Sequence, residues 1–478
     1  MYSKKLLHGK ITQLNQFLIL GMGVLATLFV YLSSTPRDGL ENLFLIPMTF
    51  TVCFFFFGDL LKLHKGSIGF KIFYSIVLLK YIVSPILITQ TRNLHFMRRV
   101  VDPSSYQMAI LIISLELFLA CVTIRTAWSY YQKYPPRKKN IVDKPNLSSL
   151  AWLVCLILVL ISILRFDRFI SGVNFLFLSK STSELGSFEG ISLLVIKSFV
   201  FIRVLIYSKR KYYFSKKKIW LLLALAFSII NMTVFYGDNR SLVFQTAVVT
   251  IYVLTETFPE YRKKVLFALL PLAILTVLSM TLVRHFNYNI TEFENLGANI
   301  DLQYISETIE MYTNGVWPIG SAIDAANELG KYTVSLGTVL SDFSMNFFPF
   351  FIPIINGIRT IGSYYPSTTQ LYNYATGNVG SMLPLSGQMW FYGGNYFGLL
   401  LTSIANIIVI FYFVKFEVIS KYSKSIQYKY LYTWLSTLFG FIMCYTLITL
   451  LWSWSKYGLL LSLLYFVNRI TTRTHYQT

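Results

Sequence analysis

The chain has 478 residues, of which 55% are hydrophobic and only 13% charged, and its formal net charge is +21. Soluble domains contain about 25% charged residues, and the shortage here comes from long uncharged runs, which indicate a polytopic membrane protein. This pattern excludes a cytosolic enzyme, a secreted disulfide scaffold and a nucleic-acid-binding protein. The four cysteines lie in apolar runs without metal-binding or redox spacing, so we expect small buried hydrophobic residues.

Runs of about 20 apolar residues, the length that crosses the hydrocarbon core, predict about twelve transmembrane helices in an all-α fold. No small-residue cleavage site follows the first run, so we expect it to be retained. The predicted spans are 13–34, 41–61, 68–89, 105–126, 147–165, 190–208, 219–236, 241–258, 265–283, 386–414, 430–451 and 454–468. The chain thus divides into an N-terminal transmembrane region (1–283), a large loop (284–385) and a C-terminal transmembrane region (386–478).

The distribution of charge predicts the orientation of these spans. With the N-terminus inside, cytoplasmic segments hold 26 of the 42 Lys and Arg residues, as the positive-inside rule requires. We therefore expect a multi-pass membrane protein with both termini in the cytoplasm. Its basic excess would meet anionic membrane lipids, with no role for nucleic acid.

The outer segments contain nine Arg but only three Lys. Guanidinium binds phosphate in a planar bidentate fork, so this bias predicts a phosphate-bearing ligand at the outer membrane surface. Pairing with the outer acidic residues is the alternative. Arg92, His95 and Arg99 recur at helical spacing near the end of the third span, and Arg359 lies in the large loop.

Two outer elements place arginines at helix ends. The loop between the seventh and eighth spans is only residues 237–241, and its glycine permits a tight turn that holds Arg240 beside Asp238. Arg284 and His285 end the ninth span. Three ionisable residues, Lys80, Glu116 and Lys197, lie inside predicted spans. Because a charged group is costly in hydrocarbon, we expect each of them either to line a cavity or to pair with another helix.

The large outer loop is expected to fold rather than act as a polar linker. Residues 301–314 read as an amphipathic helix, with Leu302, Ile305, Ile309 and Tyr312 on one side. Residues 322–329 suit a second helix, and 343–358, broken by two prolines, suit a segment on or in the membrane surface. Residues 364–374, including Tyr372, mix aromatic, hydroxyl and amide groups, which suits a sugar ring; an interfacial aromatic belt is the alternative.

No nucleotide-binding loop or hydrolase elbow is present, and the cytoplasmic loops are too short to contain a nucleotide-sugar domain. Only two histidines are expected outside, and neither a histidine cluster nor a calcium-binding loop occurs. The sequence therefore predicts no cofactor and no metal site. Any chemistry would use a lipid-borne or extracytoplasmic substrate.

Residues 386–398, Ser-Gly-Gln-Met-Trp-Phe-Tyr-Gly-Gly-Asn-Tyr-Phe-Gly, resemble the Gly-Glu-x-Tyr…Asn-Phe-Gly pattern of the bacterial O-antigen and capsular oligosaccharide repeat-unit polymerases (Wzy-type). Gln388 stands where a glutamate is common in that family. Residues 237–240, Gly-Asp-Asn-Arg, resemble its Gly-x-Arg element with one extra residue. The order of spans, short outer loop, large outer loop and final helices is also similar.

The resemblance implies a metal-independent membrane glycosyltransferase with a C-type fold, located in the bacterial cytoplasmic membrane. It would transfer a growing glycan from undecaprenyl diphosphate to the non-reducing end of another lipid-linked repeat unit, making a capsular, exopolysaccharide or O-antigen chain. A chain-length regulator and a flippase are candidate partners. Outward arginines would stabilise the departing diphosphate, and a base would take the proton of the attacking hydroxyl. The candidate catalytic residues are Arg240, Arg284, His285 and Asp238, with the acids of the large loop as further bases; the candidate substrate-binding residues are Arg359, Arg92, Arg99, Tyr372, Gln388 and Tyr392.

Two other functions stay open. A C-type glycosyltransferase that uses a polyprenyl-phosphate sugar would carry acidic residues in the first outer loop, where Asp38 and Glu41 lie. A lipid-linked oligosaccharide flippase or other transporter would show two related halves and charges along a central cavity. No such repeat is visible in the sequence, and one outer loop dominates.

Overall fold

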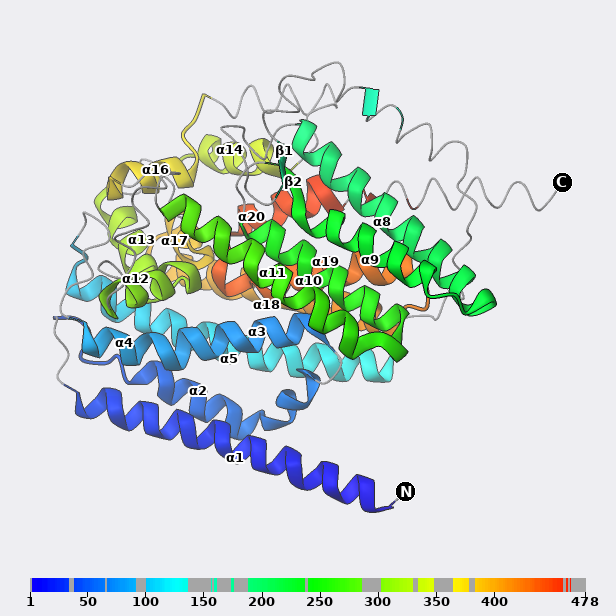
Figure 1. Ribbon diagram of the computed structural model, residues 1–478. Helices are drawn as coiled ribbons and strands as arrows, with labels where there is room; N and C mark the ends of the chain where they lie inside the picture. Colours follow the sequence, from blue (N-terminus) through cyan, green and yellow to red (C-terminus); the bar gives the residue numbers. More distant parts are fainter. Residues whose placement is uncertain are drawn as a thin grey trace. The chain divides into compact units, whose positions relative to one another are not determined.

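The structure is a computed structural model (Figure 1). It describes residues 2–33, 38–64, 67–91, 100–135, 156, 159–160, 173–175, 188–236, 240–285, 302–329, 334–347, 364–377, 383–458, 461–462 and 465. These residues are mostly helical and fall into two compact units. Unit 1 comprises residues 1–135, 297–417 and 438–452, and unit 2 comprises residues 136–296, 418–437 and 453–478. The units group helices by packing, whereas the three predicted regions group them by order along the chain.

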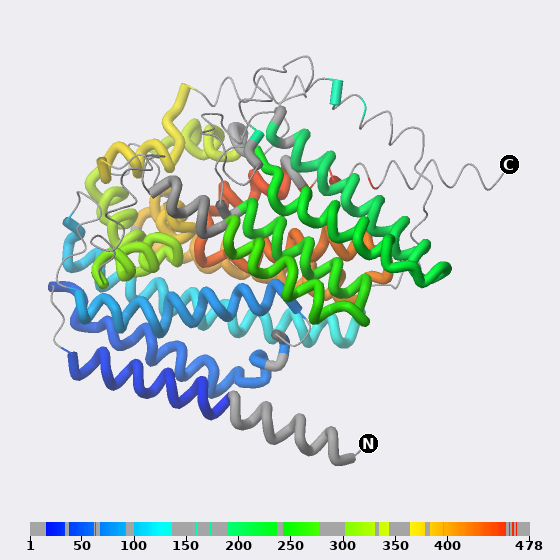
Figure 2. Tube along the Cα trace, in the orientation of Figure 1, coloured from blue at the N-terminus to red at the C-terminus, as the bar shows by residue number. Residues whose placement is uncertain are grey.

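Unit 1 begins with a layer of N-terminal helices, blue to cyan in Figures 1 and 2. In this layer α1 packs against α2, and α2 packs against α5. The elements are α1 (Tyr2–Leu32), α2 (Leu45–Phe56), the 3-10 helix η1 (Gly58–His64), α3 (Ile68–Leu78), the π-turn η2 (Leu79–Val83), α4 (Ser84–Gln90) and α5 (Pro103–Lys133). The hydroxyl of Tyr81 donates to the carbonyl of Ile113 at 2.8 Å and ties η2 to α5.

The π-turn between α3 and α4 has a local cause. Pro85 has no N–H to donate to the carbonyl four residues earlier, so the regular hydrogen-bond ladder is interrupted there. The turn nevertheless keeps α3, η2 and α4 in one apolar helix, residues Ile68–Gln90. Lys80, an ionisable residue of a predicted span, lies within this π-turn.

Three helices among the described residues are long and apolar enough to cross a membrane: Ile68–Gln90, Pro103–Lys133 and Tyr396–Tyr422. A fourth span is possible by length and composition if the segments 242–257 and 259–276, which are bent by 114° at their junction, are taken together. These helices fit the all-α membrane protein expected from the composition. The predicted span at 147–165 lies largely outside the described residues.

Two predicted spans of the C-terminal region are interrupted. Residues 386–414, expected as one helix, form α17 (Leu385–Gly393) and α18 (Asn395–Tyr422), separated at Gly394, whose φ is +61°. The span expected at 430–451 forms α19 (Ile426–Gly440), the 3-10 helix η5 (Ile442–Cys444) and α20 (Leu447–Ser453), followed by the π-turn η6 (Trp454–Gly458). Both single-helix predictions were therefore wrong, because a backbone break within an apolar run leaves its hydropathy unchanged.

The large loop folds into short helices, light green to yellow in Figure 2. They are α12 (Leu302–Thr313), α13 (Val316–Leu329), α14 (Leu336–Phe347) and α16 (Thr368–Thr376). The helix expected at 301–314 is present, whereas the helix expected at 322–329 begins six residues earlier, at Val316. Residues 348–358 of the predicted proline-broken segment lie outside the described residues.

Unit 2 contains four long helices in sequential contact, green in Figure 1. They are α8 (Phe188–Ser215), α9 (Ile219–Thr233), α10 (Arg240–Thr257) and α11 (Arg262–His285), and the 3-10 helix η3 (Pro259–Tyr261) joins the last two. Two three-residue strands, β1 (Val173–Phe175) and β2 (Val234–Tyr236), pair antiparallel. The sequence predicted no strand, so this small sheet is an addition to the expected all-α fold.

Candidate functional site

A buried carboxylate joins three helices of the large loop and its C-terminal flank. Asp342 in α14 accepts hydrogen bonds from the backbone N–H of Thr368 at 3.0 Å and from the Thr368 hydroxyl at 2.6 Å. The hydroxyl of Tyr392 donates to Oδ2 of the same carboxylate at 2.6 Å. Nε2 of Gln388 donates to that hydroxyl at 2.8 Å. One acidic group therefore connects α14, α16 and α17.

Opposing effects act on the Asp342 carboxyl group. Burial raises its pKa above the ordinary aspartate value, whereas the hydrogen bonds from Thr368 and Tyr392 lower it, and burial is the larger effect. Thr368 is the first residue of α16, so the carboxyl group also faces the positive end of a helix. A carboxylate whose pKa is raised is a better proton acceptor near neutral pH than an exposed one.

Tyr392 and Gln388, two predicted substrate-binding residues, belong to this network. Tyr392 is half-buried, whereas Asp342 and Gln388 are buried. Oε1 of Gln388 has no hydrogen-bond partner within the described residues. An orphaned buried acceptor of this kind is unusual, because buried polar atoms are normally hydrogen-bonded.

Tyr372, also a predicted substrate-binding residue, lies in the core of the same region. It is buried against Ala322, Ala325 and Leu383, and its hydroxyl lies 2.9 Å from Oγ of Ser321. In this structure Tyr372 therefore supports packing and does not face solvent. Tyr364 and Tyr374 are 80% and 82% exposed, so they present aromatic faces where the sequence predicted sugar contacts.

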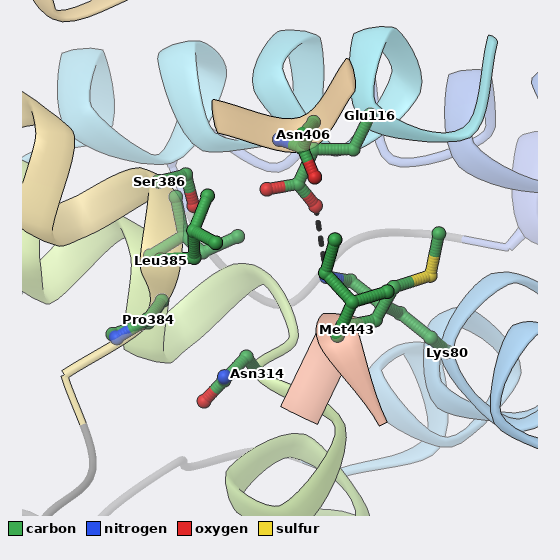
Figure 3. Close-up of a pocket in the computed structure, with 10 residues that line it drawn as sticks. Lys80, Glu116, Asn314, Pro384, Leu385, Ser386, Asn406 and Met443 are labelled. Atoms are coloured by element: carbon green, nitrogen blue, oxygen red, sulfur yellow. Dashed lines mark hydrogen bonds and ion pairs between the residues drawn. The ribbon is translucent and has the colours of Figure 1, made fainter. Parts of the chain in front are cut away.

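A second polar cluster lies among the long apolar helices of unit 1 (Figure 3). Nζ of Lys80 and Oε2 of Glu116 form an ion pair of 3.1 Å with side chains 1% and 7% exposed. The pair lines a cavity of about 10 Å³, the space of about one water molecule. Its wall also includes Asn314, Ser386 and Asn406. Oδ1 of Asn314 and Oγ of Ser386 are buried and have no hydrogen-bond partner within the described residues.

Glu310 extends this cluster into the large loop. Its carboxylate accepts hydrogen bonds from the Ser84 hydroxyl and, at 3.1 Å, from the backbone N–H of Trp317. It also interacts electrostatically with Lys80. Because Trp317 is the second residue of α13, the carboxylate satisfies the start of that helix. A side chain at Gly315 would collide with the carboxylate, so Glu310 would have to shift from this position to make room for it.

In unit 2, Lys197 supports the segment that precedes residues 237–241. Its ammonium donates hydrogen bonds to the backbone carbonyls of Asn231 and Val234 at the end of α9, where helical carbonyls lack intrahelical partners. Nδ2 of Asn231 in turn donates to Oγ1 of Thr250 at 2.8 Å and to the Tyr430 hydroxyl at 3.2 Å. Lys197 thus pairs with the backbone at the end of another helix, which was the predicted alternative to lining a cavity.

The five arginines predicted for the site have no described side chains, and only Arg240 and Arg284 have a described backbone. Arg240 begins α10 and Arg284 lies in the last turn of α11, so both stand at the helix ends remote from the turn that joins α10 to α11. The side chains of Arg240, Arg284 and His285 are outside the described part of the structure. So are residues Asp238, Arg92, Arg99 and Arg359.

The structure describes Asp38 and Glu41, the two acidic residues on which the alternative of a polyprenyl-phosphate-sugar glycosyltransferase rests. Asp38 and Glu41 are exposed. Oε1 of Glu41 accepts a hydrogen bond of 3.0 Å from the backbone N–H of Gly39, and backbone N–H groups lower the pKa of the Glu41 carboxyl. The pair occupies a tight turn between α1 and α2.

Metal-ligating side chains do not cluster in the described part of the structure. Within the described residues, no group of three or more His, Cys, Asp or Glu side chains is placed to hold a metal ion. Sequence reasoning named the acids of the large loop only as a class and did not single out Asp342 or Thr368. The sequence signal that could have identified Asp342 and Thr368 is weak, because it consists of one aspartate in an apolar segment and one hydroxyl residue at the start of a helix.

Comparisons of the chain with protein-family models, with curated proteins and with solved structures found no match.

Proposed function

We propose that this protein polymerises undecaprenyl-diphosphate-linked oligosaccharide repeat units on the outer face of a bacterial cytoplasmic membrane. In this proposal the chain crosses the membrane about twelve times, both termini are cytoplasmic, and residues 284–385 connect two spans on the extracytoplasmic side. The product is a capsular, exopolysaccharide or O-antigen chain. The observation that carries the proposal is the network of Asp342, Tyr392 and Gln388, because it combines a buried acid with two predicted substrate-binding residues.

The proposed reaction needs a proton acceptor beside a sugar hydroxyl. A hydroxyl at the non-reducing end of one lipid-linked unit attacks the anomeric carbon of the growing chain, and the bond from that carbon to undecaprenyl diphosphate breaks. Tyr392 takes the hydroxyl proton and passes its own proton to Asp342. Gln388, whose Oε1 lacks a described partner, accepts a hydrogen bond from a neighbouring sugar hydroxyl and orients the acceptor.

The departing undecaprenyl diphosphate gains negative charge and needs cationic donors. We assign this role to Arg240 and Arg284, with Arg359, Arg92 and Arg99 binding the lipid-linked substrates. Guanidinium forks neutralise a diphosphate without a divalent cation. Their positions at the ends of α10 and α11 support this assignment, because a spanning helix delivers its terminal residues to the membrane surface.

One specific observation favours a transporter as the second candidate. The Lys80–Glu116 pair lies beside a cavity between spanning helices, and a transporter places charges at such a site. The cavity has the volume of about one water molecule, far too small for an oligosaccharide. We therefore rank polymerisation first.

The test is the glycan profile of a strain that lacks the protein. Polymerase loss leaves single repeat units attached to their outer-face acceptor, with no longer chains. Loss of a flippase instead leaves lipid-linked units on the cytoplasmic side and removes single units from the surface as well. Surface-exposed single units therefore support the polymerase, and their absence supports the transporter.

A further inference from the structure

The helix α12 has its polar and apolar faces reversed relative to a helix packed on a water-soluble core. Ser306, Glu307 and Glu310 are 0%, 7% and 1% exposed, respectively. Leu302, Ile305 and Tyr312 are 46%, 40% and 52% exposed. In water, an amphipathic helix buries its apolar face. The reversed arrangement is favourable only where the surroundings are themselves apolar.

The contacts of α12 place its C-terminal end deep among the spanning helices. The helix packs against α4 and the π-turn η2, and Glu310 receives a hydrogen bond from Ser84. Lys80, with which Glu310 interacts, lies ten residues before the end of the spanning helix at Gln90. At 1.5 Å per residue this is about 15 Å, half of the hydrocarbon thickness of about 30 Å.

The length of α12 agrees with this depth. Its 12 residues extend about 18 Å, which carries the chain from the membrane surface to the level of Lys80. The chain then turns at Asn314 and Gly315 and returns as α13, whose residues Val316–Ala325 are all buried. Non-helical backbone at this depth must be buried in protein, and here Asn314 is 2% exposed while the carboxylate of Glu310 receives the N–H of Trp317.

We infer that α12 and α13 form a re-entrant hairpin within the membrane, and that Leu302, Ile305 and Tyr312 contact lipid acyl chains. The buried acidic face is held by Ser84 and Lys80 of the neighbouring spanning helix. Lipid, rather than another protein, is expected at the exposed face of α12 because α12 packs on α4, and α4 packs on α1. The outer face of α1 is also apolar and exposed, as at Leu25 and Leu32. The inference is independent of the polymerase proposal, because it concerns only the membrane contact of unit 1.

Spin-label accessibility measures this depth directly. The full-length protein carries a nitroxide at Ile305→Cys in vesicles of phosphatidylethanolamine and phosphatidylglycerol, and relaxation by oxygen is compared with relaxation by a water-soluble nickel complex. Ile404→Cys, on the spanning helix α18 and 45% exposed, is the lipid reference, and Tyr374→Cys is the aqueous reference. Cys53, Cys121 and Cys444 are buried, and Cys155, which lies outside the described residues, is replaced by Ser in every variant, so the Cys155→Ser protein is the labelling blank.

We expect position 305 to resemble position 404, with high oxygen and low nickel accessibility. Nickel accessibility like that at position 374 would overturn the inference. So would spectral broadening at position 305 that disappears on dilution with unlabelled protein, because a second copy would then cover the face. If Ile305→Cys fails to fold, Leu302→Cys serves at the same face.

As a second readout, Ile305→Asp should lower the melting temperature in vesicles, while Ile305→Ala should have little effect. Equal melting temperatures of the two variants would contradict lipid contact.

Discussion

The hydroxyl of Tyr392 donates a hydrogen bond of 2.6 Å to Oδ2 of Asp342, and Nε2 of Gln388 donates to that hydroxyl at 2.8 Å. The acid is fully buried and the tyrosine is half-buried. Any group that exchanges a proton with Asp342 from outside therefore does so most directly through Tyr392. This relationship gives the proposed mechanism its most specific consequences.

Removal of the Tyr392 hydroxyl should reduce polymerisation strongly while the fold persists. Tyr392→Phe keeps the ring, and Asp342 retains its hydrogen bonds from Thr368. General-base contributions are worth about 10²–10⁴ in rate, and we expect a loss in that range. The control is Tyr396→Phe, a tyrosine 89% exposed on α18, which should polymerise normally at matched membrane levels. Equal activity of both variants would remove the Tyr392–Asp342 pair from the mechanism.

The raised pKa of Asp342 predicts the pH dependence of the reaction. Only the ionised carboxylate accepts a proton, and burial moves its pKa above the ordinary 3.8 of aspartate. Activity should therefore fall on acidification at a pH above 3.8, and it should recover as the pH rises. Asp342→Asn should give low activity without this acidic limb. A wild-type profile that remains flat on acidification through and below pH 3.8, in a protein that stays folded, would contradict the assignment.

Substitution of Arg240 separates a bidentate phosphate contact from a simple charge. Arg240→Lys keeps the charge but loses the planar fork, so we expect strong impairment, and near inactivity for Arg240→Ala. The loss of a preorganised donor costs about 10²–10³ in rate. The measurement is polymer length and amount in a deletion strain complemented at matched expression. Wild-type polymer from both variants would leave Arg284 as the leading arginine.

The buried pair of Lys80 and Glu116 should respond to single and double substitution differently. Removing one partner leaves an uncompensated buried charge, which costs about 3–5 kcal/mol. Lys80→Met and Glu116→Gln should each lower the melting temperature of the protein in nanodiscs, and the double variant should be more stable than the less stable single variant. Additive losses would show that the two charges do not stabilise each other.

The predicted spans at 68–89 and 105–126 coincide with the apolar helices Ile68–Gln90 and Pro103–Lys133, because the composition of such helices differs clearly from that of soluble helices. The breaks at Gly394 and between Gly440 and Leu447 were missed, since backbone breaks do not change hydropathy. The periodicity of residues 301–314 located α12 but not the direction of its faces, because the same pattern suits lipid outside or a core inside. Asp342 could not be singled out, since its partners Thr368 and Tyr392 are distant in the sequence.

The most direct test of the central claim uses purified protein and lipid-linked repeat units. We expect the protein to extend undecaprenyl-diphosphate-linked oligosaccharide into longer lipid-linked chains and to release undecaprenyl diphosphate, with EDTA present, because arginines would neutralise the leaving group. Activity lost in EDTA and restored by magnesium or manganese would favour the alternative centred on Asp38 and Glu41. No polymer under any of these conditions, from protein that folds and binds the lipid-linked unit, would contradict the polymerase assignment.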